Sequence, residues 1–338
     1  MKRTTFVDAV YTQTEGETTC IINGQFLFPG GTTLLEKREH FKKRFDWVRK
    51  AILNEPRGHN DLFGALIVPS SSPEADVGVI WLDGEGYGDM CGHGTIATST
   101  VMTAFDLTPQ VSSPNRIRIE TPAGIVVSEV EVEGDEVKSC RFENVPAFLA
   151  QRDIPVELPE LGTVQADIAF GGNYFITIPL PESFCRIAPE NGAILAKLGV
   201  LAKKQINEKI QLVHPEKPHI TEIDLVTFYQ PSQRPGAFYR CVHTYRNGKT
   251  DRSPGGTGTS AMLAMLEGRG RIKVGQPIQA EGLLGSGTFE GCIVRETTVA
   301  GNRAVVPTVK GRSTLVGFAK WHLDPNDENG KGYVISTV

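Results

Sequence analysis

Two short glycine-rich segments of the chain are nearly alike and differ at the one position that could carry a reactive side chain. Residues 90–95 read Met-Cys-Gly-His-Gly-Thr, and residues 254–259 read Pro-Gly-Gly-Thr-Gly-Thr. The first segment holds a thiol, Cys91, whereas Gly255 stands at the corresponding place in the second. Because glycine has no side chain to give or take a proton, the pair predicts acid–base chemistry from one side only.

Each segment leads into a helix-like stretch, over residues 96–105 and 260–267. The first N–H groups of a helix have no partner within the helix, so a glycine-rich loop at a helix start is a ready site for an anion. Two such loops in one chain predict a pseudo-symmetric cleft that holds one small anion, such as a carboxylate, from both sides.

Cys91 is the strongest candidate for chemistry. The thiolate is the reactive form of cysteine, and a helix N-terminus lowers the pKa of a cysteine placed there. Gly92 and Gly94 leave room for a substrate beside the backbone. The alternative is a buried cysteine in a tight turn. His93 lies in the same loop and would either contact a substrate or cap the helix.

Other polar residues could support such a site. Asp251, just before the second loop, would either accept a hydrogen bond from a protonated ring amine or brace the loop. Arg57 and His59 fit a structural role in loops around the cleft better than catalysis, and His219, close to two prolines, is a candidate to line the cleft. No histidine pair has the spacing of metal ligands, and no nucleotide-binding fingerprint occurs, so we expect neither a metal nor a cofactor.

The composition is that of an ordinary globular protein. A chain of 338 residues is long enough for two domains, and its net charge of −4 comes without a block of like charges, so no nucleic-acid partner is expected. No run of about 18 apolar residues occurs, and the first residues lack the apolar stretch of a secretory signal. Six dispersed cysteines indicate reduced thiols. We therefore expect a cytoplasmic protein without a membrane partner.

The pattern along the chain predicts an α+β fold of mainly antiparallel or mixed sheet. Apolar residues at helical spacing predict helices over residues 33–53 and 191–213. Strands are predicted at 5–10, 17–22, 63–68, 77–82, 117–120, 124–132, 139–143, 164–169, 225–228, 240–244, 276–281, 288–294 and 304–308. Apart from the two loops, no tandem repeat is visible.

Taken together, these features resemble the proline racemase family, which includes hydroxyproline 2-epimerases and trans-3-hydroxy-L-proline dehydratases. The resemblance runs over nearly the whole chain. Its markers are Thr-Glu-Gly-Glu at 14–17, Glu-Pro-Arg-Gly-His at 55–59, Gly-Tyr at 86–87, the loop at 90–94, Asp-Ile-Ala-Phe-Gly-Gly-Asn at 167–173, His-Pro at 214–215, His-Ile at 219–220 and Asp-Arg-Ser-Pro at 251–254.

The resemblance implies two pseudo-symmetric subdomains of α/β type, similar to diaminopimelate epimerase, with the active site in the cleft between them. We expect the first subdomain over residues 1–125 and 307–338, carrying the Cys91 loop. The second, over residues 126–306, would carry the Gly255 loop. The family uses neither metal nor pyridoxal phosphate, and a homodimer is compatible with the sequence.

Roles can be carried over to the positions that match the family's motifs. Cys91 becomes the base that takes the α-proton of a proline-type imino acid, and Asp251 contacts the ring nitrogen. Backbone N–H groups of the two loops hold the carboxylate. The loop residues expected to bind the substrate are Gly92, His93, Gly94, Gly256 and Thr257.

The chain departs from the family in three ways, one of which is a few extra residues around 10–12, between Asp8 and the Thr-Glu-Gly-Glu motif. Gly255 stands where the racemases have a second cysteine and the dehydratases a threonine, and Gln13 stands where the family has a histidine. Inversion by two thiols therefore cannot run unless water substitutes for the second. Elimination needs only one base, so we expect dehydration of trans-3-hydroxy-L-proline to pyrroline-2-carboxylate, with the void at Gly255 open to a water or a bulkier substituent.

Two alternatives stay open. A 4-hydroxyproline 2-epimerase or proline racemase would use the single thiol together with water. A non-catalytic imino-acid-binding protein would keep both loops without turnover, although a pure binder has no need of the thiol of Cys91.

Overall fold

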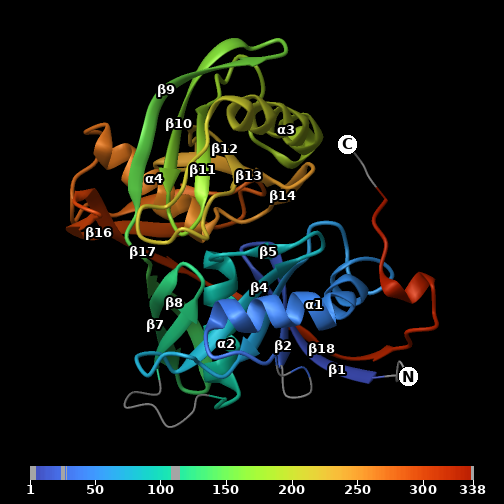
Figure 1. Cartoon of the computed structure of the whole chain (residues 1–338). Coiled ribbons are helices and arrows are strands. Elements are labelled where there is room, and N and C mark those ends of the chain that lie inside the picture. The colour runs from blue at the N-terminus through green and yellow to red at the C-terminus, as the bar shows by residue number, and fades with distance from the viewer. Residues whose placement is uncertain (1–4, 24–26, 28, 108–114, 336–338) are drawn as a thin grey trace. The chain divides into compact units, whose positions relative to one another are not determined.

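The computed structural model describes residues 5–23, 27, 29–107 and 115–335, and the chain divides into two compact units (Figure 1). The first unit comprises residues 1–142 and 312–337, and the second comprises residues 143–311. Each unit has its own hydrophobic core of strand and helix side chains. The α+β class with two subdomains, expected from the sequence, is thus observed.

The borders between the units leave two of the hairpins whole. Borders at 125/126 and 306/307, as the sequence suggested, would cut β7 (Gly124–Glu133) and β17 (Asn302–Gly311). β7 pairs with β6 (Arg116–Thr121) and β17 with β16 (Thr288–Val299), both antiparallel. Each hairpin therefore stays whole within one unit.

The first unit is a mixed sheet with strands paired in the order β18–β1–β2–β3–β4–β6–β7, and a short β5 also lies against β4. The β2–β3 and β4–β6 pairs are parallel. Helix α1 links the first parallel pair and α2 the second. The remaining elements are β1 (Thr5–Thr14), β2 (Glu17–Asn23), α1 (Leu34–Leu53), β3 (Phe63–Val68), β4 (Val77–Asp83), β5 (Tyr87–Gly88), α2 (Gly92–Ala104), β8 (Glu136–Glu143) and β18 (Ser313–Leu323).

The second unit has strands paired in the order β9–β10–β11–β12–β13–β15–β16–β17, and β14 also lies against β13. Here β11–β12 and β13–β15 are the parallel pairs, linked by α3 and α4. The elements are β9 (Phe148–Leu158), β10 (Gly162–Phe170), β11 (Tyr174–Pro179), α3 (Gly192–Lys209), β12 (Ile223–Pro231), β13 (Tyr239–Tyr245), β14 (Lys249–Asp251), α4 (Gly256–Gly268) and β15 (Ile278–Glu281).

The two units repeat one order of elements, although the sequence showed no repeat outside the loops. In each, a strand followed by a short hairpin partner leads into a glycine-rich loop and a helix, and the next strand pairs in parallel with the first. Val77 of β4 and Tyr239 of β13 begin these parallel pairings. Four residues further along lie Trp81 and His243, which therefore hold equivalent positions in the two units.

Helix α1 begins as its sequence predicts. The side chain of Thr33 accepts a hydrogen bond from the backbone N–H of Glu36, and the Glu36 carboxylate accepts one from the N–H of Thr33. This capping box satisfies two N–H groups that the helix leaves unpaired. Phe41, Val48 and Ile52 of the buried face are fully enclosed in the core of the first unit.

The loop helices begin earlier than expected. α2 starts at Gly92 instead of residue 96, and α4 at Gly256 instead of residue 260. Glycine is a poor helix former, so its presence hid the first turn from pattern analysis. The consequence is that the glycines themselves form the helix N-termini and present the N–H groups of the first turn.

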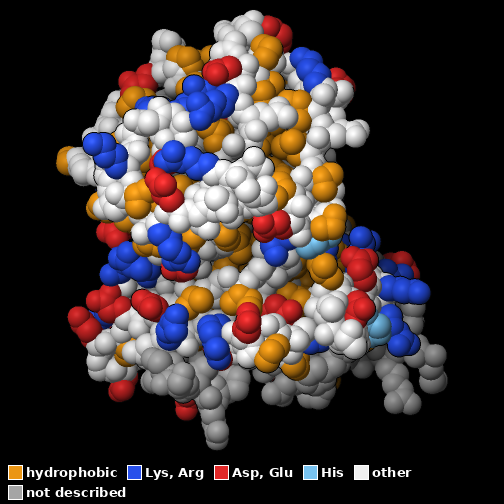
Figure 2. Space-filling view, turned by 60° about the vertical axis from the view of Figure 1, so that its left-hand side comes forward, with side chains coloured by type: hydrophobic (Ala, Val, Ile, Leu, Met, Phe, Trp, Pro, Cys, Tyr) orange, Lys and Arg blue, Asp and Glu red, His pale blue; other side chains and the backbone are white. Residues whose placement is uncertain are grey.

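The surface is of mixed charge. On the face shown in Figure 2, Lys and Arg side chains are interspersed with Asp and Glu. Within the described residues, none of the helices has the length and apolar character needed to cross a membrane.

Candidate active site

Cys91 is the N-cap residue of α2. Its backbone is extended, with φ −137° and ψ 112°, and its carbonyl accepts hydrogen bonds from the N–H and the hydroxyl of Thr95 at 3.0 and 2.8 Å. The side chain of Cys91 makes no capping hydrogen bond and is 7% exposed. The sulfur therefore stands at the positive end of the helix dipole, where a thiolate is favoured.

His93 lies beside this sulfur. Its Nε2 and Nδ1 atoms are 3.5 and 3.7 Å from the Sγ of Cys91, and its ring packs edge-on against Phe63 with 4.5 Å between the centroids. The hydroxyl of Thr14, in the Thr-Glu-Gly-Glu motif, donates to the carbonyl of His93 at 3.5 Å. His93 thus lies within the Cys91 loop, as the sequence predicted, and the motif at residues 14–17 contacts the same helix start.

Trp81 backs the first loop from β4. A Cβ atom placed on Gly94 would lie 2.8 Å from Cζ3 of Trp81 and 2.9 Å from the Sγ of Cys91. Such distances are below any ordinary carbon contact, so Gly94 is required by the close approach of the indole and the sulfur. The backbone of α2 at Gly94 therefore packs directly against the indole of Trp81 and the sulfur of Cys91.

The second loop is braced by its own side chains. The carboxylate of Asp251 accepts hydrogen bonds from the N–H and the hydroxyl of Ser253, both at 2.8 Å. The oxygen of Ser253 in turn accepts the N–H of Gly255 at 3.0 Å. Asp251 and Thr257 are both buried, at 6% and 7% exposure. A bracing role for Asp251 is therefore visible, and contact with a ring amine stays a prediction.

Gly255, the N-cap residue of α4, differs from Cys91 in its backbone as well as its side chain. Its φ is +69°, in the left-handed region that favours glycine. A Cβ atom on Gly255 would lie 2.3 Å from both Cδ2 and Nε2 of His243. The expected void at Gly255 does not exist, because an imidazole from β13 occupies that space.

His243 is fully enclosed and well bonded. Its Nε2 lies 2.8 Å from the carbonyl oxygen of Pro254, and its Nδ1 lies 2.8 Å from the hydroxyl of Thr227. Because a carbonyl can only accept, Nε2 carries a proton in this arrangement. Burial lowers the pKa of His243, whereas the nearby Asp251 and the hydrogen bond to Pro254 act to raise it. The ring is therefore neutral at rest near pH 7.

The Phe-Gly-Gly-Asn motif supports the second loop from behind. A Cβ atom on Gly171 would lie 2.4 Å from the carbonyl oxygen of Thr257 and from the N atom of Ala261, so the motif packs directly on α4. The side chain of Asn144 donates to the carbonyl of Gly171 at 2.8 Å and to the hydroxyl of Ser260 at 2.9 Å. The motif therefore fixes the start of α4.

Two further predictions concern loop residues. Arg57 donates hydrogen bonds to the carbonyls of Ala51, Gly330 and His322 at 3.3, 2.8 and 3.0 Å, which is a structural role. His219 lies in a half-buried turn after α3. It belongs to neither of the two glycine-rich loops. Its role in lining the substrate site stays a prediction.

Sequence reasoning missed Trp81 and His243, the two side chains that back the loops. Both lie in strands that were predicted correctly, but every residue of these strands is buried, so alternation of burial does not single out either side chain. Nothing in the spacing connects His243 to Gly255, which follows twelve residues later. Only the β13–β14 hairpin, in which His243 faces Asp251, brings the ring to the loop.

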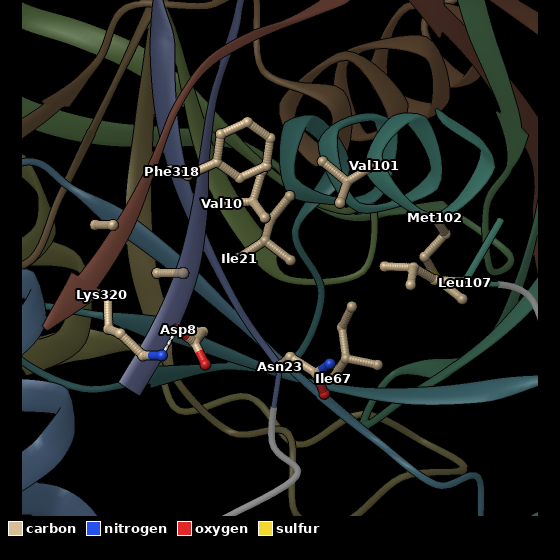
Figure 3. A pocket seen from close by; sticks show the side chains of 12 residues that line it. Asp8, Val10, Ile21, Asn23, Ile67, Val101, Met102, Leu107, Phe318 and Lys320 are labelled. Carbon is tan, nitrogen blue, oxygen red and sulfur yellow. Dashed lines mark ion pairs between the residues drawn. The ribbon is translucent and has the colours of Figure 1, made fainter. Parts of the chain in front are cut away.

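An apolar cavity of about 640 Å³ lies elsewhere in the first unit (Figure 3). It is lined by Val10 and Phe318 of the β1–β18 pair and by Val101 and Met102 of α2. With a rise of about 1.5 Å per residue, Val101 lies about 15 Å along α2 from Cys91, so this cavity is separate from the loop. Among the residues that the structure describes, no group of three or more His, Cys, Asp or Glu could hold a metal ion.

The fold and the loops define a class of protein: two α+β subdomains, each with a glycine-rich helix start suited to an anion. The chain belongs to the proline racemase family, whose model matches residues 9–334. The family expected from the sequence is thereby confirmed.

Relatives and a solved structure agree with this assignment. The chain is 49% identical over 329 residues to a 4-hydroxyproline 2-epimerase of Cereibacter sphaeroides, covering 97% of this chain and 98% of that protein. It is 40% identical over 335 residues to a proline racemase of Clostridioides difficile, covering 99% and 100%. A crystal structure of a hydroxyproline epimerase from Agrobacterium vitis with bound trans-4-hydroxy-L-proline superposes with a TM-score of 0.92 at 28% identity, covering 100% and 97%. These names favour the epimerase or racemase alternative over dehydration.

Proposed function

We propose that the chain inverts the Cα configuration of a proline-type imino acid, with 4-hydroxyproline as the first substrate. The observation that carries this proposal is the 49% identity, over almost the full length of both chains, to a 4-hydroxyproline 2-epimerase. The Agrobacterium vitis epimerase with bound trans-4-hydroxy-L-proline, which shares the fold over the whole chain, supports the same substrate class.

The chemistry starts at the helix termini. We infer that backbone N–H groups at the two helix starts bind the substrate carboxylate, because these positions match the motifs of the family. The residues are Gly92, His93 and Gly94 at the start of α2, and Gly256 and Thr257 at the start of α4. Donors aimed at a carboxylate stabilise the negative charge that moves onto it when the α-proton leaves. Cys91, as a thiolate at the start of α2, exchanges that proton.

Dehydration is less well supported than the sequence alone suggested. The sequence predicted a void at Gly255, open to a water that protonates the departing hydroxyl or to a bulkier substituent. A Cβ atom there would instead meet His243 at 2.3 Å, so that space is filled. The filled space bears equally on an inversion served by water at Gly255, so it is the names of the relatives that favour inversion with the ring hydroxyl retained.

The test is a substrate panel analysed by chiral chromatography. The purified protein is incubated with both isomers of proline, trans-4-hydroxy-L-proline, cis-4-hydroxy-D-proline and trans-3-hydroxy-L-proline, and Cys91→Ala serves as the matched control. We expect interconversion of the two 4-hydroxyproline isomers by the wild type only. An imine product from the 3-hydroxy isomer without inversion of any other would restore the dehydratase hypothesis, and tight binding without any turnover would favour the binding protein.

A further inference from the structure

We propose that the first unit binds a nucleoside polyphosphate in a basic pocket between helix α1 and the segment that follows β18. The pocket has a volume of about 670 Å³, which is within the range of sites for small organic molecules. All of its described lining residues belong to the first unit, and none of them lies in a glycine-rich loop. The inference is therefore independent of the proposed function.

The pocket concentrates positive charge. Five of its lining residues are cationic, namely Lys42, Lys43, Arg44 and Lys50 of α1 and Lys331 of the facing segment. The whole chain has a net charge of −4, so this excess is local. A hollow lined by charges of one sign attracts small ions of the other sign, which here means an anion.

The one carboxylate among the described lining residues, that of Asp46, is neutralised from within the protein. Arg49 donates hydrogen bonds to both of its oxygens at 2.7 and 3.1 Å, and the hydroxyl of Tyr87 donates another at 2.7 Å. Burial acts to raise the pKa of Asp46, but these bonds outweigh it and lower the pKa to about 2. Because Arg49 is not itself a lining residue, it cancels the charge of Asp46 without using up the pocket's own cations.

Three of the five cations have no carboxylate of their own. Among the described residues, Lys42, Lys43 and Arg44 make no ion pair, and all three are exposed. Lys42 lies over the ring of Tyr87, 6.0 Å from its centroid. Lysine and arginine both bind phosphate oxygens, so a cluster of unpaired cations favours a ligand with more than one phosphate group.

Both walls of the pocket are fixed to each other. The short helix η3 (Asn329–Lys331) lies beside the end of α1 (Figure 1). Gly332, next in the chain, has φ +90°, and a Cβ atom there would lie 2.0 Å from the carbonyl oxygen of Lys50. The N–H of Tyr333 donates to the carbonyl of Glu55 at 3.1 Å. The pocket is therefore formed before any ligand enters.

An aromatic side chain lies among the cations. Trp47 is half buried, packs against the core of the first unit and lines the pocket. It follows Lys43 by four residues and precedes Lys50 by three, so the three side chains share one face of α1. An indole offers a flat apolar surface on which a base can stack. Trp47 and the cations together fit a ligand that has both a planar ring and phosphates.

A membrane surface is the main alternative occupant. The apolar side chains of Tyr333, Val334 and Ile335, just after the pocket, are exposed. Apolar side chains beside cations are typical of segments that bind anionic lipids. The hollow favours the small ligand, because a flat lipid surface would leave a space of this size unfilled.

The test measures the binding of ATP by isothermal titration calorimetry at low ionic strength. Tripolyphosphate and adenosine are the matched probes, and sedimentation with anionic lipid vesicles tests the alternative. We expect ATP to bind at least fivefold more tightly than tripolyphosphate, because stacking of the base adds to the phosphate contacts. Adenosine should bind at least tenfold more weakly than ATP. Sedimentation with vesicles in the absence of ATP binding would overturn the proposal in favour of a membrane.

Charge variants locate the site. Lys43→Gln with Arg44→Gln should weaken ATP binding at least tenfold. Lys204→Gln with Lys209→Gln removes the same charge from exposed positions of α3 and should leave ATP binding within twofold of the wild type. Equal losses in the two double variants would show non-specific attraction, and the proposal would be wrong.

Variants of Trp47 test the stacking. Trp47→Leu should weaken ATP binding at least fivefold and leave tripolyphosphate binding within twofold, whereas Trp47→Phe keeps a ring and should retain most of the affinity for ATP. Because Trp47 packs against the core, the unfolding temperature of each variant is measured as well. Unchanged ATP binding in a Trp47→Leu variant that unfolds at the wild-type temperature would contradict a ring in the ligand.

The outcomes separate this inference from the proposed function. A wild type that inverts 4-hydroxyproline but shows no binding at millimolar ATP would overturn the inference and leave the proposed function standing. The Lys43→Gln, Arg44→Gln variant should invert 4-hydroxyproline at the wild-type rate, because both residues lie outside the loops.

Discussion

The Cys91 loop and the Gly255 loop begin equivalent helices in units of the same strand order, yet they are built in opposite ways. In the first, an extended N-cap residue carries the sulfur and an indole backs it from β4. In the second, the N-cap residue is a glycine with φ +69° and an imidazole fills its side-chain space from β13. The comparison teaches that the same place beside a helix start can be filled from the loop or from the strand behind it.

The largest effect should come from removing the only thiol in either loop. Cys91→Ala should lower the rate of α-proton exchange by about 10²- to 10⁴-fold, since a general acid–base group is lost. Deuterium incorporation at Cα measures this directly. Cys185→Ser, at a half-buried cysteine outside both loops, is the matched control and should leave the rate unchanged. Equal rates of α-proton exchange for the two variants would show that Cys91 takes no part in the proton transfer.

Substitution of Gly255, whose φ is positive, tests whether the His243 ring occupies the side-chain space of the second loop. Gly255→Ala should destabilise the protein by about 2–4 kcal/mol, because the left-handed backbone is strained and the new methyl group meets the His243 ring. Gly236→Ala is the control, since Gly236 has φ +82° but no atom within 4 Å of its Cβ position. Chemical denaturation should show a cost of about 1 kcal/mol for Gly236→Ala. The same loss of stability for both variants would mean that the His243 ring does not occupy the side-chain space of Gly255.

Variants of Asp251 and Ser253 distinguish a role of the Asp251 carboxylate in substrate binding from a role in bracing the second loop. If its carboxylate contacts the ring nitrogen, Asp251→Asn should lower kcat/KM by about 10- to 100-fold, the worth of a hydrogen bond to a charged group. Ser253→Ala removes the partner that Asp251 braces in this loop and leaves the charge in place. Steady-state kinetics that give the same loss for both variants would reduce Asp251 to a structural role.

The smallest effect concerns stability and pH. The pKa of His243 is lower in the folded protein than in the unfolded chain, so the unfolded chain binds the extra proton first. Stability should therefore fall as the pH drops below about 6.5, by at most about 2 kcal/mol at pH 5 for this one group. Urea unfolding at pH 7 and pH 5 should show a smaller loss for His243→Gln than for the wild type. A larger loss in the variant would contradict the neutral buried ring.

Local signals in the sequence predicted part of the fold well. Thr33 and Glu36 form the capping box that starts α1, and the helix ends at Leu53, where it was expected to end. Cys91 lies at a helix start beside His93, as its flanking glycines indicated. These features depend on residues close together in the chain, so short-range rules are sufficient for them.

Features that depend on strand pairing could not be read in the same way. The repeat of the two units lies in the order and direction of the strands, and its equivalent residues, such as Trp81 and His243, differ in type. The glycines at the starts of α2 and α4 hid the first helical turn, because their intrinsic preference is overridden by packing. The ring beside Gly255 comes from another strand, so the predicted void was wrong for a reason that spacing cannot show.

The most direct test of the account is a proton NMR time course of the wild type with trans-4-hydroxy-L-proline in heavy water. The account predicts a product with inverted Cα that carries deuterium there and keeps its ring hydroxyl, formed without any added metal or cofactor. Loss of the ring hydroxyl, or a spectrum in which Cα keeps both its proton and its configuration, would contradict it.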